Sequence, residues 1–464
     1  MVDVDIPQGP YREASPRPSV KDSALVKAIT IGVLMLVLLV PLGMVHGLIS
    51  ERAERRSSVV AEVSRTWSNA QEAGALVLTV PYTASWTDQY GKVQTEARSA
   101  RFLPELLTIE GRLTTASKSK SLFQVPVYTA HLTMTGHFLR PNFEKTIRIP
   151  EIQARWDEAT LTLGVGDLRG VSPGLSITWN GQTLEAAPAL EHVTLVTQAI
   201  DAKIPSLATT EANAVIPFTI ALDLKGTQQM HFQPSGKTTT VRLASTWPDP
   251  QFNGAFLPDT RDISEAGFTA EWKLSHFGHS YPQSWRDDET RPEKIVETAN
   301  QSRFGVGLVQ TVDLYQQAER SAKYGALFLL LTFTTFFLVE LFQKVRLHPI
   351  QYLLVGAAMC LFYLLLLSLA EHIGFALAYL IAAVATIGVI AMYSGFAFGG
   401  VWHGVRTALG LGQLYGFLYV LLRLEDYALV VGSVGVFLIL AALMYVTRRV
   451  NWYEIGRDTR VAGV

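Results

Sequence analysis

Residues 349–370 read PIQYLLVGAAMCLFYLLLLSLA, an apolar run that contains no charged side chain. A helix needs about 20 mostly apolar residues to cross a bilayer, because unpaired backbone groups are not tolerated in lipid. The run has this length, and Pro349 suits the first turn of a helix. It therefore predicts a transmembrane helix, around which the other apolar segments of the chain can be arranged.

Five further apolar segments are expected to span the membrane. They are residues 28–50, 325–342, 373–393, 401–422 and 427–447. When all six spans are numbered along the chain, residues 349–370 are the third and residues 401–422 are the fifth. The uncharged stretch 373–402 is too long for one span, and the small residues Ser394, Gly395, Gly399 and Gly400 predict a tight turn within it. The fold class expected is therefore a membrane protein with one N-terminal and five C-terminal transmembrane helices.

The first span is predicted to be an uncleaved anchor. A cleaved signal peptide is the alternative, but a long polar stretch precedes the span and no small-x-small cleavage site follows it. Residues 1–27 are polar and contain proline, so they are expected to form a disordered cytoplasmic tail. Residues 448–464 are expected to form a second cytoplasmic tail.

The distribution of basic residues predicts the orientation. On one side of the membrane the loops and tail hold seven basic residues, and on the other side they hold only Arg423. The seven are Lys344, Arg346, Arg406, Arg448, Arg449, Arg457 and Arg460. Because basic loops stay in the cytoplasm, both termini are expected there, in a bacterial inner membrane, and residues 51–323 outside.

Residues 51–323 are predicted to form a large, mainly β periplasmic domain. Apolar and polar residues alternate in 127–134 and in 218–224, as in strands with one buried face. Shorter strand-like pieces are also rich in β-branched or aromatic residues: 76–80, 160–165, 175–179, 238–243, 268–274 and 304–309. Both ends have helical spacing, which predicts stalks that continue the first two spans.

Composition limits the functions that the chain can perform. It is 49% hydrophobic and 17% charged, with a formal net charge of -1, so neither a soluble enzyme nor a nucleic-acid partner is expected. Cys360, the single cysteine, lies in an apolar run and cannot form a disulfide framework or a cysteine-based metal site. No cofactor is predicted.

Motifs that could carry catalysis have simpler structural explanations. Residues 170–174, GVSPG, match the G-x-S-x-G elbow, but proline follows Ser172 and a strand-like segment comes next, which favours a β-turn. Ser117 and Lys120 have S-x-x-K spacing without the accompanying motifs, which favours a solvated loop. His276 and His279 lack further ligands, so no metal site is predicted.

Glu340 and Gln413 are two of the polar residues within the apolar segments. Glu340 has Lys344 four residues later, and this spacing predicts an ion pair at the membrane interface. Gln413 lies near the middle of the fifth span, where an amide usually forms a hydrogen bond between helices. A transport pathway would need more such groups at the middle of the membrane.

Several specific motifs recur along the chain. In the membrane part they are the string 346–356, RLHPIQYLLVG, and the end of the third span, 362–375. In the exported region they are residues 166–170 (GDLRG), 246–248 (TWP), 252–254 (FNG), 256–258 (FLP), 267–268 (GF) and 51–53 (ERA). Together these motifs resemble the CreD family of inner-membrane, cell-envelope proteins. The resemblance runs over nearly the whole chain from about residue 25. It implies a role in envelope integrity, induction by a two-component system, and altered tolerance to colicins and β-lactams, with no catalytic residues.

The motif around the third span supplies the candidate structural or partner-binding residues. They are Arg346, His348, Pro349, Gln351, Glu371 and His372. His348 and Gln351 are expected to bond backbone or a neighbouring helix at the cytoplasmic interface and to face protein rather than lipid. Glu371 and His372 are expected to pair or to form a pH-sensitive contact. Alanine at His348 or Gln351 should weaken packing without preventing membrane insertion.

The leading functional prediction is a non-enzymatic protein of envelope maintenance and stress response. Its β domain would bind other envelope proteins or cell-wall components, and its helices would contact the lipid bilayer. The alternatives are a transporter or channel built from the helices, and a membrane-anchored envelope hydrolase. The transporter needs a polar path at the middle of the membrane, and the hydrolase needs a nucleophile beside a base.

Overall fold

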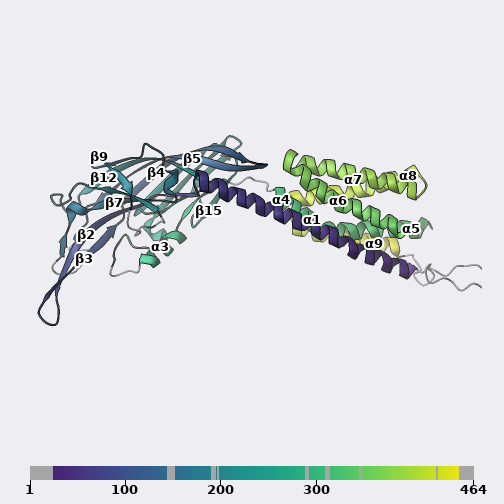
Figure 1. Cartoon of the computed structure of the whole chain (residues 1–464), viewed down its shortest axis with the longest axis horizontal. Helices are drawn as coiled ribbons and strands as arrows, with labels where there is room; N and C mark the ends of the chain where they lie inside the picture. The colour runs from purple at the N-terminus through teal and green to yellow at the C-terminus, as the bar shows by residue number, and fades with distance from the viewer. Residues whose placement is uncertain are drawn as a thin grey trace, which may run out of the picture. The chain divides into compact units, whose positions relative to one another are not determined.

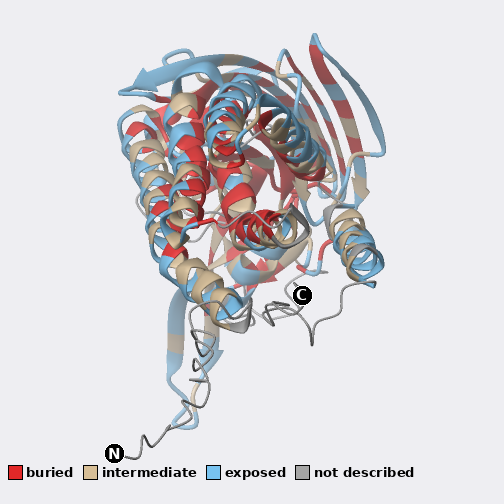
Figure 2. Ribbon diagram, turned by 90° about the vertical axis from the view of Figure 1, so that its right-hand side faces the viewer, coloured by how far each residue is buried: buried red, intermediate tan, exposed pale blue. Residues whose placement is uncertain are grey.

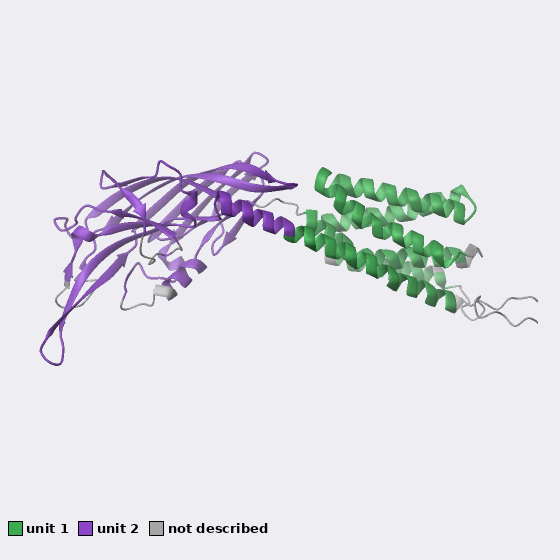
Figure 3. Cartoon of the chain, viewed as in Figure 1, with its two compact units in different colours: residues 1–54, 312–464 green, residues 55–311 purple. Residues whose placement is uncertain are grey.

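The computed structural model describes residues 24–143, 152–189, 195, 198–287, 292–308, 314–343, 347–424 and 427–448. The chain divides into two compact units, which Figure 3 shows in separate colours. Residues 1–54 and 312–464 form the helical unit, and residues 55–311 form the β unit.

The described helices of the helical unit include one at each predicted span. They are the first part of α1 (Ala24–Trp67), α4 (Leu314–Lys323), α5 (Gly325–Gln343), α6 (Pro349–Ile373), α7 (Phe375–Ala397), α8 (Val401–Arg423) and α9 (Ala428–Thr447), all labelled in Figure 1. In α6 the buried side chains recur at helical spacing, for example Tyr352, Val355, Met359 and Phe362. Figure 2 shows buried segments on the facing sides of several of these helices, whereas α9 has no buried residue among those described.

Among the described residues, four helices are long and apolar enough to cross a membrane: α1, α6, α7 and α8. The pair α4 and α5 is bent by 41° and makes a fifth if it counts as one span. The apolar part of α9, Val430–Tyr445, is shorter. Several membrane helices are therefore present, and the count of six stays a prediction.

The turn predicted in the long apolar stretch is confirmed. Helix α7 ends at Ala397 and α8 begins at Val401. Between them Gly399 has a φ of 72°, a conformation that favours glycine. Small residues thus allow the chain to reverse between two membrane helices.

The segment before α5 forms the separate helix α4. Sequence spacing predicts this segment as a stalk of the β domain, whereas the structure assigns it to the helical unit. Its apolar face is buried there through Tyr315, Ala318 and Ala322, and the helix packs against α6. Because this face is used within the helical unit, α4 is an integral part of that unit.

The β unit contains three sheets in its described residues. The first has the order β1 (Gln71–Ala73), β13 (Gln229–Phe232), β19 (Phe304–Leu308) and β15 (Pro250–Gly254). The second has the order β10 (Ala186–Pro188), β11 (Gln198–Lys203), β7 (Thr160–Val165), β2 (Ala75–Thr87), β3 (Val93–Phe102) and β18 (Ser284–Arg286), with β6 (Ile152–Ala154) paired to β2. The third has the order β16 (Thr260–Ser264), β17 (Gly267–Ser275), β14 (Thr238–Ser245), β4 (Leu106–Lys120), β5 (Phe123–Leu139), β12 (Val215–Thr227), β8 (Ser176–Trp179) and β9 (Gln182–Leu184).

Alternation in the sequence explains the long strands of the third sheet. In β12 every second residue from Ile216 to Leu224 is buried, and the residues between them are more exposed. Strands β4 and β5 form an antiparallel hairpin, whereas β4 and β14 are parallel. The strands predicted at 127–134 and 218–224 are confirmed as parts of β5 and β12.

One apolar core joins the three sheets. It includes Tyr82 of the second sheet, Trp272 of the third sheet and Phe304 of the first sheet. The rings of Trp272 and Phe304 lie 5.6 Å apart between their centroids, within the range of a favourable aromatic contact. Since the sheets share this core, the β unit is one domain.

Two helical segments cover parts of the β unit. The last turns of α1 pack Val63, with Val59 and Trp67 beside it, against Val127 of β5, so the helical spacing expected after the first span is confirmed. Helix α3 (Pro292–Gln301) packs Ile295 and Ala299 near β2. The short η2 (Trp156–Glu158), η3 (Leu168–Gly170) and η4 (His276–Gly278) are 3₁₀ turns.

Candidate functional site

The start of α6 contains the motif residues of the third span. His348 is the N-cap, and its Nδ1 accepts a hydrogen bond from the Ile350 N–H at 3.3 Å. The Gln351 Oε1 accepts a hydrogen bond from the His348 N–H at 2.9 Å. Pro349 occupies the first turn, where a helix has no use for its missing N–H. Together these contacts form a capping box, which satisfies N–H groups that the helix leaves free.

The capping box matches the expected bonds to backbone and not the alternative of bonds to a neighbouring helix. Within the described residues, the hydrogen bonds of His348 and Gln351 stay inside the first turn of α6. His348 is exposed, and Gln351 is half-buried. A side chain at the N-cap is held close to the N–H groups of the same turn, so the local bond forms more readily than one to another helix. Arg346 lies outside the described residues.

Glu371 and His372, at the other end of α6, have separate partners. The Glu371 Oε1 accepts a hydrogen bond from the Tyr315 hydroxyl at 3.0 Å, and the Arg52 Nε lies 3.8 Å from the same oxygen. The His372 Nδ1 lies 3.2 Å from the Ser368 carbonyl oxygen. Glu371 therefore links α6 to α4 and α1, and it does not pair with its neighbour His372.

Glu340 of α5 has more described partners than any of these residues. One carboxylate oxygen forms an ion pair with the Lys27 Nζ and accepts a hydrogen bond from the Leu347 N–H at 3.0 Å. The other oxygen accepts a hydrogen bond from the Tyr352 hydroxyl at 2.9 Å. The glutamate thus holds α1, α5 and the start of α6 together. The expected partner, Lys344, lies outside the described residues.

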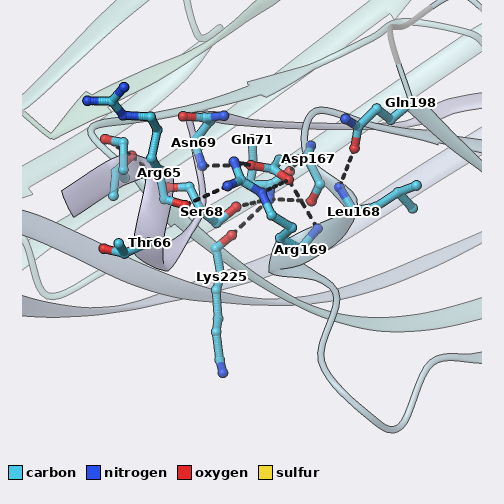
Figure 4. A network of polar contacts seen from close by, with 12 residues as sticks. Arg65, Thr66, Ser68, Asn69, Gln71, Asp167, Leu168, Arg169, Gln198 and Lys225 are labelled. Carbon is cyan, nitrogen blue, oxygen red and sulfur yellow. Dashed lines mark hydrogen bonds and ion pairs between the residues drawn. The ribbon is translucent and has the colours of Figure 1, made fainter. Parts of the chain in front are cut away.

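The turn GDLRG of the β unit is built around Asp167, whose side chain is only 3% exposed. Its carboxylate accepts hydrogen bonds from the Asn69 N–H at 3.0 Å and from the Arg169 Nη2 at 2.6 Å (Figure 4). The Arg169 Nη1 also donates to the Arg65 carbonyl oxygen at 2.5 Å. Gln71 completes the network, because its Nε2 donates to the Asp167 carbonyl oxygen at 2.9 Å. The turn is therefore fastened to the end of α1.

The charge and the glycine of this turn fit the same role. The hydrogen bonds from Arg169 hold the pKa of the Asp167 carboxyl at about 2, well below its ordinary value. A Cβ atom at Gly170 would lie 2.2 Å from the Gln71 Nε2 and 2.3 Å from the Lys225 carbonyl oxygen. Only glycine fits at this point of close approach. The motif GDLRG therefore has a structural role, which is to connect this turn to the end of α1.

A second buried polar cluster was not foreseen from the sequence. Glu72 is buried, its carboxylate lies 3.3 Å from the Arg303 Nη1, and burial raises its pKa. The His231 Nε2 lies 3.0 Å from the Asn253 Oδ1, and burial lowers the pKa of this imidazole. The available signal was a lone acid, Glu72, four residues before the predicted strand 76–80, and this signal is weak.

Ser172 has the β-turn environment that the sequence predicts. Its N–H donates to the Asp223 carbonyl oxygen at 2.9 Å. A turn at Pro173 and Gly174 follows and leads into strand β8. A nucleophile elbow needs a strand that turns into a helix, so this motif provides no activated serine.

The two histidines considered as metal ligands, His276 and His279, have separate environments. The buried His279 has its Nδ1 3.0 Å from the Tyr281 carbonyl oxygen, and its ring stacks on the ring of Tyr281. The His276 ring lies beside Phe277. In the described part of the chain, no three His, Cys, Asp or Glu residues form a group that could hold a metal ion.

A groove of about 510 Å³ lies over β4, β14, β17 and β16 of the third sheet. Its charged residues Glu110, Arg242 and Glu271 stand in register on adjacent strands. The Arg242 Nε lies 2.9 Å from the Glu271 carboxylate, and the Arg242 Nη1 lies 3.4 Å from that of Glu110. Beside this row, β16 is the end strand of the described sheet, and its 5 residues are exposed. The sheet thus offers a charged surface next to an exposed strand edge.

Comparison with solved structures gives only weak similarity. An M1 zinc metallopeptidase from Deinococcus radiodurans matches at 13% identity with a TM-score of 0.21, over 37% of this chain and 38% of that chain. A two-domain M1 zinc metallopeptidase bound to L-tryptophan matches at 13% identity with a TM-score of 0.17, over 37% of this chain and 40% of that chain. These scores support no conclusion about fold or activity.

Comparison with known sequences is decisive. The chain is 31% identical over 431 residues to the inner membrane protein CreD of Escherichia coli strain K12, which covers 91% of this chain and 92% of that protein. The family model described as inner membrane protein CreD matches residues 23–453. The motifs at the start of α6 and at Asp167 fall within this match. The chain therefore belongs to the CreD family of inner membrane proteins.

Proposed function

We propose that this protein is a non-enzymatic component of cell-envelope maintenance, and that its β unit binds extended segments of other envelope proteins. The observation that carries the proposal is the exposed edge of β16 beside the charged groove. An edge strand presents N–H and C=O groups that can pair with a strand from another chain. Charged side chains of both signs in the groove would select the segment that pairs.

The proposed location of the β unit is outside the cytoplasm. The seven basic residues on one side of the spans, against one on the other, support cytoplasmic termini and an exported β unit. This orientation assumes six spans, which are α1, α5 to α8 and α9. It places the β16 edge among envelope components, where the proposed partners are found.

The structural roles of the polar clusters support a function without catalysis. Asp167 is held by Arg169 and backbone N–H groups, and Ser172 stands in a β-turn. Glu340 is occupied by three donors. A hydrolase would need a nucleophile within hydrogen-bond reach of a base, and the motif-level candidate Ser172 is not in such a position.

Reversal of charge at Arg242 tests the proposed binding surface. Arg242→Glu, produced in a strain that lacks the native gene, is expected to fail to restore wild-type tolerance to a β-lactam. An exposed ion pair contributes only about 0–1 kcal/mol, so the amount of protein in the membrane should stay unchanged. Arg98→Glu, which changes another strand arginine paired with a glutamate, should restore tolerance and serves as the control.

A photo-crosslinker at Asp262 of β16 provides the second readout. It is expected to give a discrete adduct with an envelope protein, and Arg242→Glu should abolish that adduct. Full tolerance with Arg242→Glu, together with no adduct at Asp262, would contradict binding through this surface. Loss of tolerance with Ser172→Ala at normal protein levels would instead support the hydrolase alternative.

A further inference from the structure

The helical unit contains a cavity of about 530 Å³ between α5, α8 and α9. Most of its lining is apolar, from residues such as Leu331, Leu411 and Leu438. The exposed side chain of Leu438 and the exposed Gln413 form part of its wall, so the cavity is open at the side of the helices. In a membrane-embedded helix bundle, such an opening faces the lipid.

Polar groups in this cavity lack described partners. Thr332 is only 3% exposed, and its hydroxyl has no hydrogen-bond partner among the described residues. The neighbouring Thr335, which also lines the cavity, instead donates to the Leu331 carbonyl oxygen at 2.8 Å. The Nδ1 of His403 is buried without a described partner as well. A ligand with polar atoms could satisfy both groups.

The charge of the cavity lies at one end. Arg406 and His403 belong to the first turns of α8, whereas Leu414 and Phe417 lie deeper along the same helix. The described residues that line the cavity include no Asp or Glu. Arg406 forms no ion pair with a described residue. A rise of about 1.5 Å per residue separates His403 from Phe417 by about 21 Å along α8.

We propose that this cavity binds a membrane lipid, with its anionic headgroup phosphate at Arg406 and His403 and an acyl chain along α8. The length of the lining suits one chain plus its headgroup, because each leaflet contributes about half of a hydrocarbon core of about 30 Å. Arginine donates charge-assisted hydrogen bonds to phosphate. The sequence predicts that Gln413 forms a hydrogen bond between helices, whereas in this proposal it lines the part of the cavity that holds the acyl chain.

Native mass spectrometry of the full-length protein in detergent tests this site. The probes are a phosphatidylglycerol and a phosphatidylcholine with the same acyl chains. Wild-type protein should retain phosphatidylglycerol preferentially. Arg406→Gln should reduce its retention about tenfold, the size of one lost charge-assisted hydrogen bond, and leave phosphatidylcholine nearly unchanged. Arg423→Gln, at the other end of α8 and outside the cavity lining, should behave as wild type.

A glycine pair tests the acyl path separately. Gly410 lines the cavity, and a Cβ there would meet no atom within 4 Å. Gly410→Leu should therefore fill the cavity and reduce retention of both lipids. Gly412 has the same open surroundings but does not belong to the described lining, so Gly412→Leu should leave retention unchanged. Thermal unfolding of each variant verifies that it is folded.

Three results would overturn the proposal. The first is equal retention by Arg406→Gln and Arg423→Gln, and the second is wild-type retention by Gly410→Leu. The third is displacement of phosphatidylglycerol by millimolar inorganic phosphate, which would identify a site for free anions. None of these outcomes depends on the proposed binding surface of the β unit.

Discussion

Asp167 receives four hydrogen bonds on one carboxylate: from the backbone N–H groups of Asn69 and Arg169, and from two guanidinium nitrogens of Arg169. The bond from the Asn69 N–H ties together two segments that are 98 residues apart in the chain. A buried carboxylate is stable only when such partners replace water. The same residue therefore both fixes the turn and positions the strand that begins at Gln71.

Asp167→Asn should lower the free energy of unfolding of the β unit by about 2 kcal/mol at pH 7, since the carboxyl pKa of about 2 lies below its value of 3.8 in unfolded chains. A carboxyl group whose pKa is lowered by folding stabilises the folded state at any pH above the pKa that the group has in the unfolded chain. This stabilisation should disappear as the pH falls from 4 toward 2. Urea unfolding of the full-length protein, followed by tryptophan fluorescence, measures the difference.

The exposed Asp157 provides the control. Asp157→Asn is expected to change the free energy of unfolding by less than about 0.5 kcal/mol. If Asp167→Asn unfolds like Asp157→Asn at pH 7, the carboxylate does not hold the turn. A deficit in Asp167→Asn that persists unchanged at pH 2 would show that the charge is not its cause.

Residue-level prediction from sequence succeeded where the determinants are local. The turn at Ser172 follows from proline and glycine placed next to it. The partners of Asp167, by contrast, come from the end of α1 and from Gln71, and nothing in the sequence pairs those positions. Glu340 was recognised as unusual within an apolar run, but Lys27 and Tyr352 as its partners depend on helix packing.

At the scale of elements, α6 depends on close contact at a glycine. A Cβ at Gly356 would lie 2.2 Å from the Leu38 Cδ1 of α1 and 2.9 Å from the Phe333 Cζ of α5. Membrane helices approach closely where small residues lie, because packing replaces the hydrophobic effect as the source of attraction. Gly356 thus allows three helices to meet.

Gly356→Ala should destabilise the helical unit by about 1–3 kcal/mol, the range for overpacking of a filled core. Gly388 of α7 is the matched control, since a Cβ there would meet no atom within 4 Å. Thermal unfolding of the purified full-length variants in detergent makes the comparison. A Gly356→Ala melting temperature at or above that of Gly388→Ala would refute the close contact.

Elements whose apolar residues recur with a regular period were predictable from the sequence, and elements that are defined by their packing were not. The alternation in β5 and β12 and the apolar runs of α6, α7 and α8 identify them directly. Helix α3 and the break between α4 and α5 at Tyr324 have weaker signals, because their apolar faces depend on what they cover. For His348 and Gln351 the sequence left bonds to backbone and to a neighbouring helix both open, since their residue types suit both roles.

At the scale of the whole molecule, several membrane helices are combined with one large β domain. The family membership and the structure both support this description. The sequence pattern predicted this division, because apolar runs and alternating strands occupy separate parts of the chain. The side of the membrane on which the β unit lies depends on the translocation of the chain. The positive-inside rule is the physical basis for the predicted side, and the proposed binding function requires it.

Labelling of a single introduced cysteine tests this orientation most directly. Cys360, the only natural cysteine, is buried, whereas Tyr90 in the turn between β2 and β3 is 84% exposed. In spheroplasts, Tyr90→Cys should react with a membrane-impermeant maleimide, and a cysteine at position 345 should react only after the membrane is permeabilised. The opposite pattern, with Tyr90→Cys protected until permeabilisation, would contradict an exported β unit that binds envelope proteins.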